Sequence, residues 1–225
     1  MNILIFNRTR AFCALGFLLL AALPLKANAL CICLTCILTD KHSFVISSSA
    51  MSPFLNIDDC IIAEIARGPE MALEPGEVVL FREDDGAVFI FRYIAGPGQT
   101  VQMKNGALVL DGKAVDRQPA EPFRLMNVLG GPWGRLPGCP PPTLEGEECA
   151  IDAYTETLPN GATYQVLDLS VASGDNTLIL EVPDGHIFVL GDNRDNSLDS
   201  RFAKRFGGRG FIPTENVIGR YLYHN

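Results

Sequence analysis

The sequence predicts a mainly β fold built from antiparallel sheets, and two features of the chain point to it. Its 225 residues include 21 Gly and 15 Pro, which is too many turn-forming residues for a bundle of long helices. Apolar runs of four to eight residues, rich in Val, Ile, Phe and Tyr, recur between these turns, as is typical of strands. A chain of this length can bury a full core without a metal or a disulfide.

The expected strands follow turn signals along the chain. They are residues 77–82, 87–94, 107–110, 113–115, 177–182, 186–190 and 217–223. Asp111-Gly112 separates two of them and is a strong hairpin signal. Residues 59–66 fit a helix or a strand equally well. Residues 117–182, which hold many Pro and Gly, are expected to form a less regular inserted region.

The N-terminus has the pattern of a secretory signal peptide over residues 1–29. Arg8 and Arg10 precede an uncharged run, residues 11–23, and Ala-Asn-Ala at 27–29 fits a cleavage site. An uncleaved anchor is the alternative. The run would span only about 20 Å as a helix, against roughly 30 Å of hydrocarbon. Residues 30–38 are apolar again, however, so both alternatives stay open, and both predict that residues 30–225 are exported.

The charge of the chain bears on its partners. The formal net charge is −8, and the first 29 residues hold three basic residues and no acidic one. The remaining 196 residues therefore carry 15 basic and 26 acidic residues, a net charge of −11. Because the basic residues form no run, we expect no nucleic-acid partner. Anionic lipid would not attract this body either, so any contact with a membrane surface would depend on apolar side chains.

Export also permits disulfides, and the chain has seven Cys. Cys139 and Cys149 flank a Pro-rich turn, and we predict a disulfide between them. Cys60 lies in an apolar run and is predicted to be a buried free thiol. The remaining cluster lacks the paired spacing of a zinc ribbon and has no His near enough to complete one, so no metal or other cofactor is predicted; it consists of Cys31, Cys33 and Cys36.

A polar segment near the C-terminus carries the most specific signal. Residues 191–201 read GDNRDNSLDSR and directly follow the apolar run 187–190. Short acids and amides of this kind bond backbone donors, and the Arg side chains can pair with the acids. A solvated turn needs only two or three such residues, so eleven indicate a functional loop.

This segment resembles the most diagnostic motif of type I signal peptidases (serine peptidase family S26), the membrane-bound proteases that remove signal peptides from exported proteins. Further segments resemble family motifs in the same order: 48–55 (SSAMSPFL), 74–79 (EPGEVV), 92–99 (RYIAGPGQ), 156–161 and 210–213. The resemblance covers roughly residues 44–223. It implies a signal peptidase-like domain over residues 30–225, with a catalytic core and a second, inserted β region at about 117–182.

The residues that perform the family's chemistry are absent. Members of the family use a Ser nucleophile and a neutral Lys that accepts its proton. The motif places the Ser at position 50 and the Lys at position 91, where this chain has Ala50 and Phe91. Ala has no nucleophile and Phe accepts no proton, so we predict that peptidase activity is lost.

A displaced dyad is the alternative, with Ser49 or Ser52 as the nucleophile. On an extended segment the side chain of Ser49 faces away from that of residue 50, and Ser52 lies about 7 Å along the chain. Arg92 cannot serve as a base, since its pKa is above about 12. Lys104 lies beyond a turn, and none of the three His occupies position 91.

The resemblance implies that the supporting residues remain. Ser48 corresponds to the side-chain donor of the oxyanion hole, and Ser197 to the residue that bonds the Lys amine. It also implies two buried or half-buried ion pairs, Arg92–Asp192 and Asp199–Arg201. The first has an independent reason, because an Arg inside the apolar run FIFRYI needs a carboxylate. Gln99 stands where the family has Asp, which we expect to loosen that turn.

The family's substrate groove takes an extended peptide with small residues at the first and third positions before the cut. Its walls are expected from Met51, Pro53 and the strand with Ile90. The family's apolar, membrane-facing rim corresponds to Phe54, Leu55 and residues 123–133. Ordinary core packing explains the apolar residues of that last stretch equally well; they are Phe123, Leu125, Met126 and Trp133.

Three functional hypotheses follow. The first is a non-catalytic signal peptidase homologue, in the periplasm or on the outer face of the inner membrane, that binds exported peptides or proteins. The second is an active signal peptidase, a serine endopeptidase, with a displaced nucleophile. The third is a structural domain that binds no peptide.

Overall fold

The computed structural model describes residues 31, 33, 36, 39–66, 71–127, 139 and 143–224. The described chain is mainly β. Its strands are β1 (Lys41–Val45), β2 (Cys60–Ile65), β3 (Val78–Arg82), β4 (Val88–Ala95), β5 (Thr100–Lys104), β6 (Ala107–Leu110), β7 (Lys113–Ala114), β8 (Asp116–Met126), β9 (Glu148–Thr157), β10 (Thr163–Asp168), β11 (Leu180–Glu181), β12 (His186–Leu190), β13 (Ile212–Pro213) and β14 (Val217–His224). Three short 3-10 helices are η3 (Arg194–Asn196), η4 (Lys204–Phe206) and η5 (Thr214–Asn216).

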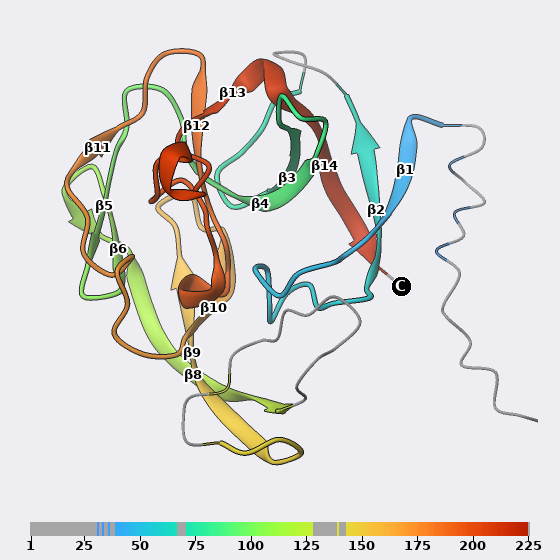
Figure 1. The fold of residues 1–225 in the computed structure, drawn as a ribbon. Coiled ribbons are helices and arrows are strands. Elements are labelled where there is room, and N and C mark those ends of the chain that lie inside the picture. Colours follow the sequence, from blue (N-terminus) through green and yellow to red (C-terminus); the bar gives the residue numbers. More distant parts are fainter. Residues whose placement is uncertain are drawn as a thin grey trace, which may run out of the picture. The chain divides into compact units, whose positions relative to one another are not determined.

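The strands form three sheets with antiparallel pairing, as the sequence predicts (Figure 1). The seven-stranded sheet has the order β1-β2-β14-β3-β4-β12-β13. A four-stranded sheet has the order β11-β5-β6-β7, and a three-stranded sheet the order β10-β9-β8. β14 lies between β2 and β3, so the last strand of the chain pairs with two of its early strands.

Turn chemistry explains why the predicted strands form where they do. β3 and β4 are runs of β-branched and aromatic residues separated by a turn that ends at Gly86, which has φ +86°. β6 and β7 join through Asp111 and Gly112, with φ +48° and +73°, the left-handed pair that two-residue hairpins require. The ambiguous residues 59–66 form strand β2.

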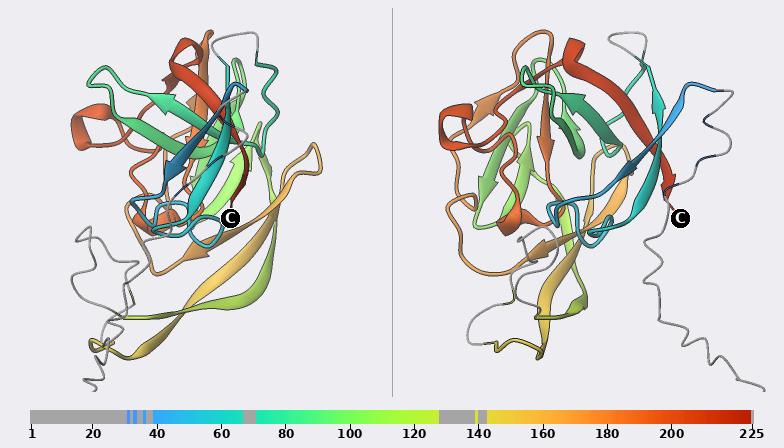
Figure 2. Two further views of the ribbon diagram at one scale, coloured as in Figure 1. Left: turned by 90° about the vertical axis from the view of Figure 1, so that its right-hand side faces the viewer. Right: turned by 45° about the vertical axis from the view of Figure 1, so that its right-hand side comes forward.

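The inserted region is more regular than the sequence predicts. β8 and β9 form a long paired ribbon that projects from the rest of the described chain (Figures 1 and 2). The sequence pattern does not predict β8, because this strand is largely polar and contains Pro119 and Pro122. Its register with β9 shifts between Ala120 and Phe123. The expected strand 177–182, in contrast, shortens to the two residues of β11.

The cysteines correct one prediction. Cys60 is not a free thiol but forms a disulfide with Cys31, because Cys31 bonds to residues of β1, the strand that pairs with β2. The predicted disulfide between Cys139 and Cys149 is present. A further disulfide joins Cys33 and Cys36.

Several predictions concern the N-terminus and the stretch of residues 123–133, which the structure describes only in part. The signal peptide or anchor of residues 1–29 and Trp133 lie outside the described residues. Phe123 and Leu125 pack against the small core under β9, while Met126 is 54% exposed. Within the part of the chain that is described, no helix is long and apolar enough to cross a membrane.

Candidate functional site

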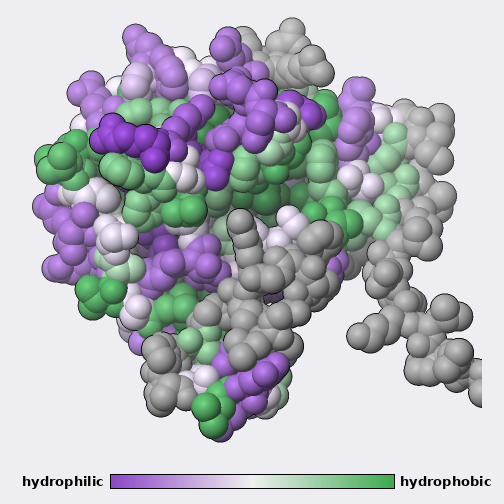
Figure 3. Space-filling view, in the orientation of Figure 1, coloured by the Kyte–Doolittle hydropathy of each residue, from purple (hydrophilic) through white to green (hydrophobic). Residues whose placement is uncertain are grey.

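Two adjoining cavities lie beside β4. The larger, of about 500 Å³, is lined by Ser48, Ser49, Ala50, Phe89, Phe91, residues 172–174, residues 194–198, Phe202 and Arg209. The smaller, of about 380 Å³, is lined by residues 44–48, Ile61, Leu80 and residues 88–91. The two share Ser48, Phe89 and Phe91, so they meet along one face of β4. Figure 3 shows a hollowed hydrophobic surface over the region of β3 and β4.

The structure brings together the two positions that the motif resemblance assigns to the dyad. Ala50 and Phe91 both line the larger cavity, although they come from a loop and from β4. The Phe91 side chain is buried and stacks on Phe81, with ring centroids 6.1 Å apart. Phe81 also stacks on Phe89 at 5.8 Å. An aromatic stack therefore occupies the place where the family's motif puts an amine.

The polar loop of residues 191–201 is fastened to the segment that carries Ala50. The Asn193 backbone N–H donates to the Ala50 carbonyl at 3.0 Å, and the Asn193 side-chain amide donates to the Ser49 carbonyl at 3.2 Å. The Asn196 amide donates to the Ser49 hydroxyl at 2.5 Å. Three hydrogen bonds thus hold the loop against the position where the nucleophile would stand.

Asp199 organises the loop from within. It is fully buried, and its Oδ2 accepts from the Gly191 N–H at 3.1 Å and from the Ser197 hydroxyl at 2.9 Å. Arg201 pairs with it through Nε at 2.9 Å, as the motif implies. In place of a Lys amine, Ser197 therefore has the Asp199 carboxylate as a partner.

The ion pair between Arg92 and Asp192 is present and buried. Arg92 donates to both carboxylate oxygens, at 2.8 and 2.5 Å, and also to the Gly76 carbonyl at 2.7 Å. Phe54 and Tyr164 flank the guanidinium, at 5.0 and 4.4 Å from their ring centres. Burial raises the pKa of Asp192 although Arg92 opposes that shift. Burial is the largest single influence and would lower the pKa of Arg92, but the charge and hydrogen bond of Asp192 together with Tyr164 outweigh it, so the pKa is raised.

A third buried ion pair was not predicted from the sequence. Arg194 donates to both oxygens of Glu156, at 3.0 and 2.6 Å, and both side chains are nearly inaccessible. Glu156 comes from β9, so this pair attaches the loop to the inserted region. Burial is the largest single influence and would lower the pKa of Arg194, but Glu156, Tyr164 and Asp192 together outweigh it, so the pKa is raised. The one signal in the sequence for this pair is that Glu156 lies in a segment that resembles a family motif, residues 156–161.

The serines proposed as displaced nucleophiles have other partners. The Ser49 hydroxyl accepts from Asn196, and the Ser52 hydroxyl donates to the Asn56 side-chain oxygen at 2.9 Å. Both serines are 2% exposed. Among the described residues that line the larger cavity there is no Lys and no His. Each hydroxyl thus has an Asn side chain as a partner, and a side-chain amide cannot act as a general base.

The expected groove and rim residues separate in the structure. Ser48 and Ile90 line the cavities beside β4. Met51 is 1% exposed and packs in the core, and Pro53 lines a different cavity with Phe54 and Arg92. Leu55 is fully buried, so it cannot belong to an exposed apolar rim.

The turn at Gln99 is not loosened, since its side-chain oxygen accepts from the Gly96 N–H at 2.9 Å. A glutamine oxygen thus closes the turn in place of a carboxylate. Across the described ranges of the chain, no three His, Cys, Asp or Glu side chains are grouped so as to hold a metal ion.

Comparison with known proteins gives a consistent result. The family model for signal peptidase, peptidase S26, matches residues 19–223. Signal peptidase I of Rickettsia typhi is 32% identical over 196 residues, which cover 82% of this chain and 62% of the relative. That of Rickettsia prowazekii is 31% identical over 196 residues, with the same coverage. The chain thus spans about three fifths of the length of these relatives.

A crystal structure of a signal peptidase I from Enterococcus faecalis V583 covers 68% of this chain and 98% of its own, with 22% identity and a TM-score of 0.35. The family itself follows from the match over residues 19–223. This chain belongs to the S26 family of signal peptidases.

Proposed function

We propose that this chain is a non-catalytic member of the signal peptidase family that binds extended segments of exported proteins without cleaving them. One observation carries the proposal: Ala50 and Phe91, which occupy the positions of the family's nucleophile and base, line the same cavity. The loop of residues 191–201, which supplies part of the cavity wall, is held in place by the buried ion pairs Arg92–Asp192, Arg194–Glu156 and Asp199–Arg201. The framework of the site thus remains while its reacting groups do not.

The shape and chemistry of the cavities support a peptide ligand. The smaller cavity is bounded by the apolar side chains of Phe44, Ile46, Leu80 and Ile90, and it adjoins the larger one at Ser48. An extended chain with small apolar side chains at alternate positions would direct them to one face, as strand geometry requires. Ser48, at the junction, offers a hydroxyl to a peptide carbonyl.

The hydrogen bonds of Ser49 and Ser52 argue against a displaced dyad. Each hydroxyl is bonded to an Asn side chain, which is neither an acid nor a base near neutral pH. The charged groups of the larger cavity are Arg194, Asp195 and Arg209. Arg194 and Arg209 pair with Glu156 and Glu83, and an Arg cannot accept a proton. The Asp195 carboxylate accepts from the backbone N–H groups of Leu169 and Ser170 and from neither serine in the described contacts.

The site of action in the cell belongs to the same proposal. We place the body on the exported side, in the periplasm or at the outer face of the inner membrane, where segments of exported proteins become available. Membrane contact through apolar side chains is part of the proposal, and nucleic acid is not. Because residues 30–225 carry a net charge of −11, anionic lipid would repel them unless apolar contacts compensate.

The test measures binding and cleavage on the same sample. A fluorescent signal-peptide substrate with Ala at the first and third positions before the cut is added to the purified chain. Fluorescence anisotropy reports binding, and mass spectrometry reports cleavage. We expect saturable binding with no product.

Two variants make the test specific. Ser48→Trp fills the junction of the two cavities and should abolish binding. Thr163→Trp places the same side chain at an exposed position of β10 outside both cavities and should leave binding unchanged. Cleavage lost in Ser49→Ala or Ser52→Ala would establish the displaced dyad instead. Absence of both binding and cleavage would leave a structural domain.

A further inference from the structure

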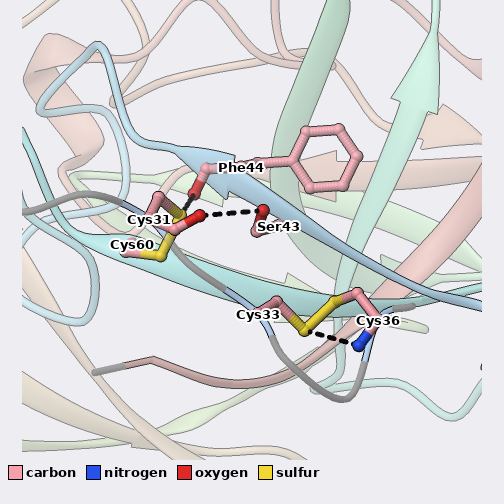
Figure 4. Close-up of a disulfide and its surroundings, with 6 residues drawn as sticks. All are labelled: Cys31, Cys33, Cys36, Ser43, Phe44 and Cys60. Atoms are coloured by element: carbon pink, nitrogen blue, oxygen red, sulfur yellow. Dashed lines mark hydrogen bonds between the residues drawn. A yellow bond between two sulfur atoms is a disulfide. The ribbon is translucent and has the colours of Figure 1, made fainter. Parts of the chain in front are cut away.

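Three disulfides occur in the described chain, and they differ in what they connect. Cys31–Cys60 closes a separation of 29 residues and ties the segment before β1 to β2. Cys139–Cys149 closes a separation of 10 residues and joins a position that precedes β9 to a position within that strand. Cys33–Cys36 closes a separation of only 3 residues, so it joins two neighbouring positions of the chain (Figure 4). Because a disulfide restrains the unfolded chain less when its loop is shorter, this third bond contributes least to the fold.

When a disulfide stabilises a fold, the fold stabilises the disulfide by the same free energy, and the bond becomes harder to reduce. Cys60 is 6% exposed and Cys149 is 8% exposed, so each of the two longer-range bonds has one sulfur-bearing residue shielded from reagents. Cys33 and Cys36 are both half-buried, and neither belongs to a strand. The Cys33–Cys36 bond is therefore less shielded than the two longer-range disulfides, and it joins no strand to another element.

The local geometry also favours the reduced form of the pair. The backbone N–H of Cys36 donates to Cys33 Sγ at 3.0 Å and to the Cys33 carbonyl at 3.3 Å (Figure 4). An N–H that points at sulfur donates to a thiolate there and so stabilises it. A stabilised thiolate is also the better leaving group when the disulfide is attacked.

We propose that Cys33 and Cys36 form a thiol–disulfide exchange site that oxidises dithiols of polypeptides. The substrate class is a pair of cysteine thiols on an unfolded or extended chain, which is also the form of chain that the cavities beside β4 are proposed to take. The exchange site does not depend on that proposal, because neither cysteine lines those cavities.

The reaction is balanced by the two cysteines themselves. A substrate thiolate attacks Cys36 Sγ, the Cys33–Cys36 bond breaks, and its electron pair stays on Cys33 Sγ beside the Cys36 N–H. The second substrate thiolate then attacks the substrate sulfur of the mixed disulfide, and Cys36 leaves as a thiolate. The substrate loses two electrons and becomes a disulfide, the cysteine pair gains them, and the protons of the substrate thiols pass through water to the two cysteines. A low-molecular-weight disulfide restores the pair by the reverse exchange.

The first test compares the three disulfides within one chain. The full chain with Cys13→Ser is equilibrated in glutathione buffers, alkylated and analysed cysteine by cysteine by mass spectrometry. We expect Cys33–Cys36 to be half reduced at a ratio [GSH]²/[GSSG] at least ~10-fold lower than the other two bonds, equivalent to about 30 mV. Half-reduction at the same ratio as Cys31–Cys60, or at a higher one, would overturn the proposal.

The second test measures exchange directly. A reduced dithiol peptide should be oxidised by one equivalent of the chain, and the double variant Cys33→Ser/Cys36→Ser should oxidise none. The matched control, Cys139→Ser/Cys149→Ser, loses a disulfide of longer range and should retain the full equivalent. Equal oxidation by the two double variants would refute a role for the Cys33–Cys36 pair.

The third test distinguishes the two sulfurs. The alkylation rate of Cys33 in Cys36→Ser and of Cys36 in Cys33→Ser is followed against pH. Because the backbone N–H of residue 36 persists in both variants, Cys33 should have the lower midpoint. Equal midpoints would contradict the proposed order of attack. Binding of the signal peptide should be unchanged throughout, which separates this proposal from the function of the cavities.

Discussion

At the scale of single residues, the buried charges of the site have few ways to be satisfied. Arg92 lies inside an apolar strand, and Asp192 is the carboxylate that pairs with it, with side-chain exposures of 6% and 1%. Removal of one partner leaves the other charge buried without compensation, and this costs more than the pair contributes. Arg92 therefore makes Asp192 necessary for the fold whether or not the site is catalytic.

Asp192→Asn should accordingly lower the free energy of unfolding by about 3–5 kcal/mol. Urea denaturation under oxidising conditions measures it. Asp168→Asn is the matched control, since Asp168 pairs with Arg117 at 2.7 Å but both side chains are more exposed. That control should cost about 1 kcal/mol or less. Equal losses in the two variants would contradict the assignment of Asp192 as a buried counter-charge.

Asp111 provides a residue-scale effect that depends on pH. The Thr100 N–H donates to its carboxylate at 2.8 Å and lowers the pKa of Asp111 below its usual value. A carboxyl group whose pKa is lower in the folded state adds stability above the unfolded pKa of about 3.9, and this is lost as pH falls through the folded value. Since Asp111 is exposed, the effect is reduced by solvent screening.

Asp111→Asn should therefore destabilise the chain more at pH 7 than at pH 2.5, as measured by thermal unfolding at both values. Asn tolerates the left-handed backbone of this turn, so the hairpin itself is kept. Asp152→Asn, at an exposed position of β9, is the control. A difference that is independent of pH would show that the Thr100 hydrogen bond does not depend on the ionised carboxylate.

At the scale of elements, the loop of residues 191–201 depends on the absence of a side chain at Gly191. A Cβ at this position would lie 2.6 Å from the Ala50 carbonyl oxygen and nearer still to the Ser197 hydroxyl. Gly191→Ala must therefore displace the loop from the segment with Ala50. We expect it to lower stability by about 1–3 kcal/mol and the affinity for the signal peptide by at least ~10-fold.

Gly185→Ala serves as the comparison, measured by the same anisotropy and denaturation experiments. Gly185 has φ +71° and open space where a side chain would stand, so an Ala there costs backbone strain without a clash. It should lower stability and leave peptide affinity unchanged. If both variants bind peptide normally, the contact between the loop and Ala50 does not shape the cavity.

Much of this element-scale arrangement could be predicted from the sequence, and the exceptions have physical reasons. β3, β4, β12 and β14 are continuous apolar runs bounded by turns, so periodicity identifies them. β8 is polar and contains two Pro residues, so its pairing with β9 depends on partners that no local pattern shows. Asn105 and Gly106, both with positive φ, form the turn between β5 and β6, and Asn-Gly is a hairpin signal in the sequence.

The same distinction holds for the site. The pairs Arg92–Asp192 and Asp199–Arg201 fall within family motifs, and both are present. Arg194–Glu156 joins residues 38 positions apart in two elements, and nothing local to either residue indicates it. Met51 and Leu55 are apolar residues of a loop, and only the packed core determines that they are buried rather than exposed.

At the scale of the whole molecule, the proposal that this chain lacks only the family's reacting groups can be tested by restoring them. In Ala50→Ser/Phe91→Lys, the new hydroxyl and the new amine would line the same cavity, with Phe81 and Phe89 around the amine. Burial among these rings lowers the pKa of a Lys, so a neutral amine can accept the Ser proton. The buried ion pairs of the loop and its side-chain hydrogen bond to Ser49 do not involve either altered side chain.

The double variant should therefore cleave the signal-peptide substrate, with a rate that rises with pH through the lowered pKa of the Lys. Each single variant should bind without cleavage, because it lacks one half of the dyad. Ala50→Ser/Phe91→Met restores the hydroxyl beside an apolar side chain and controls for repacking; it should be inactive. Circular dichroism checks that the Lys variant is folded. A folded double variant that binds peptide and yields no product would show that the framework has changed along with the dyad.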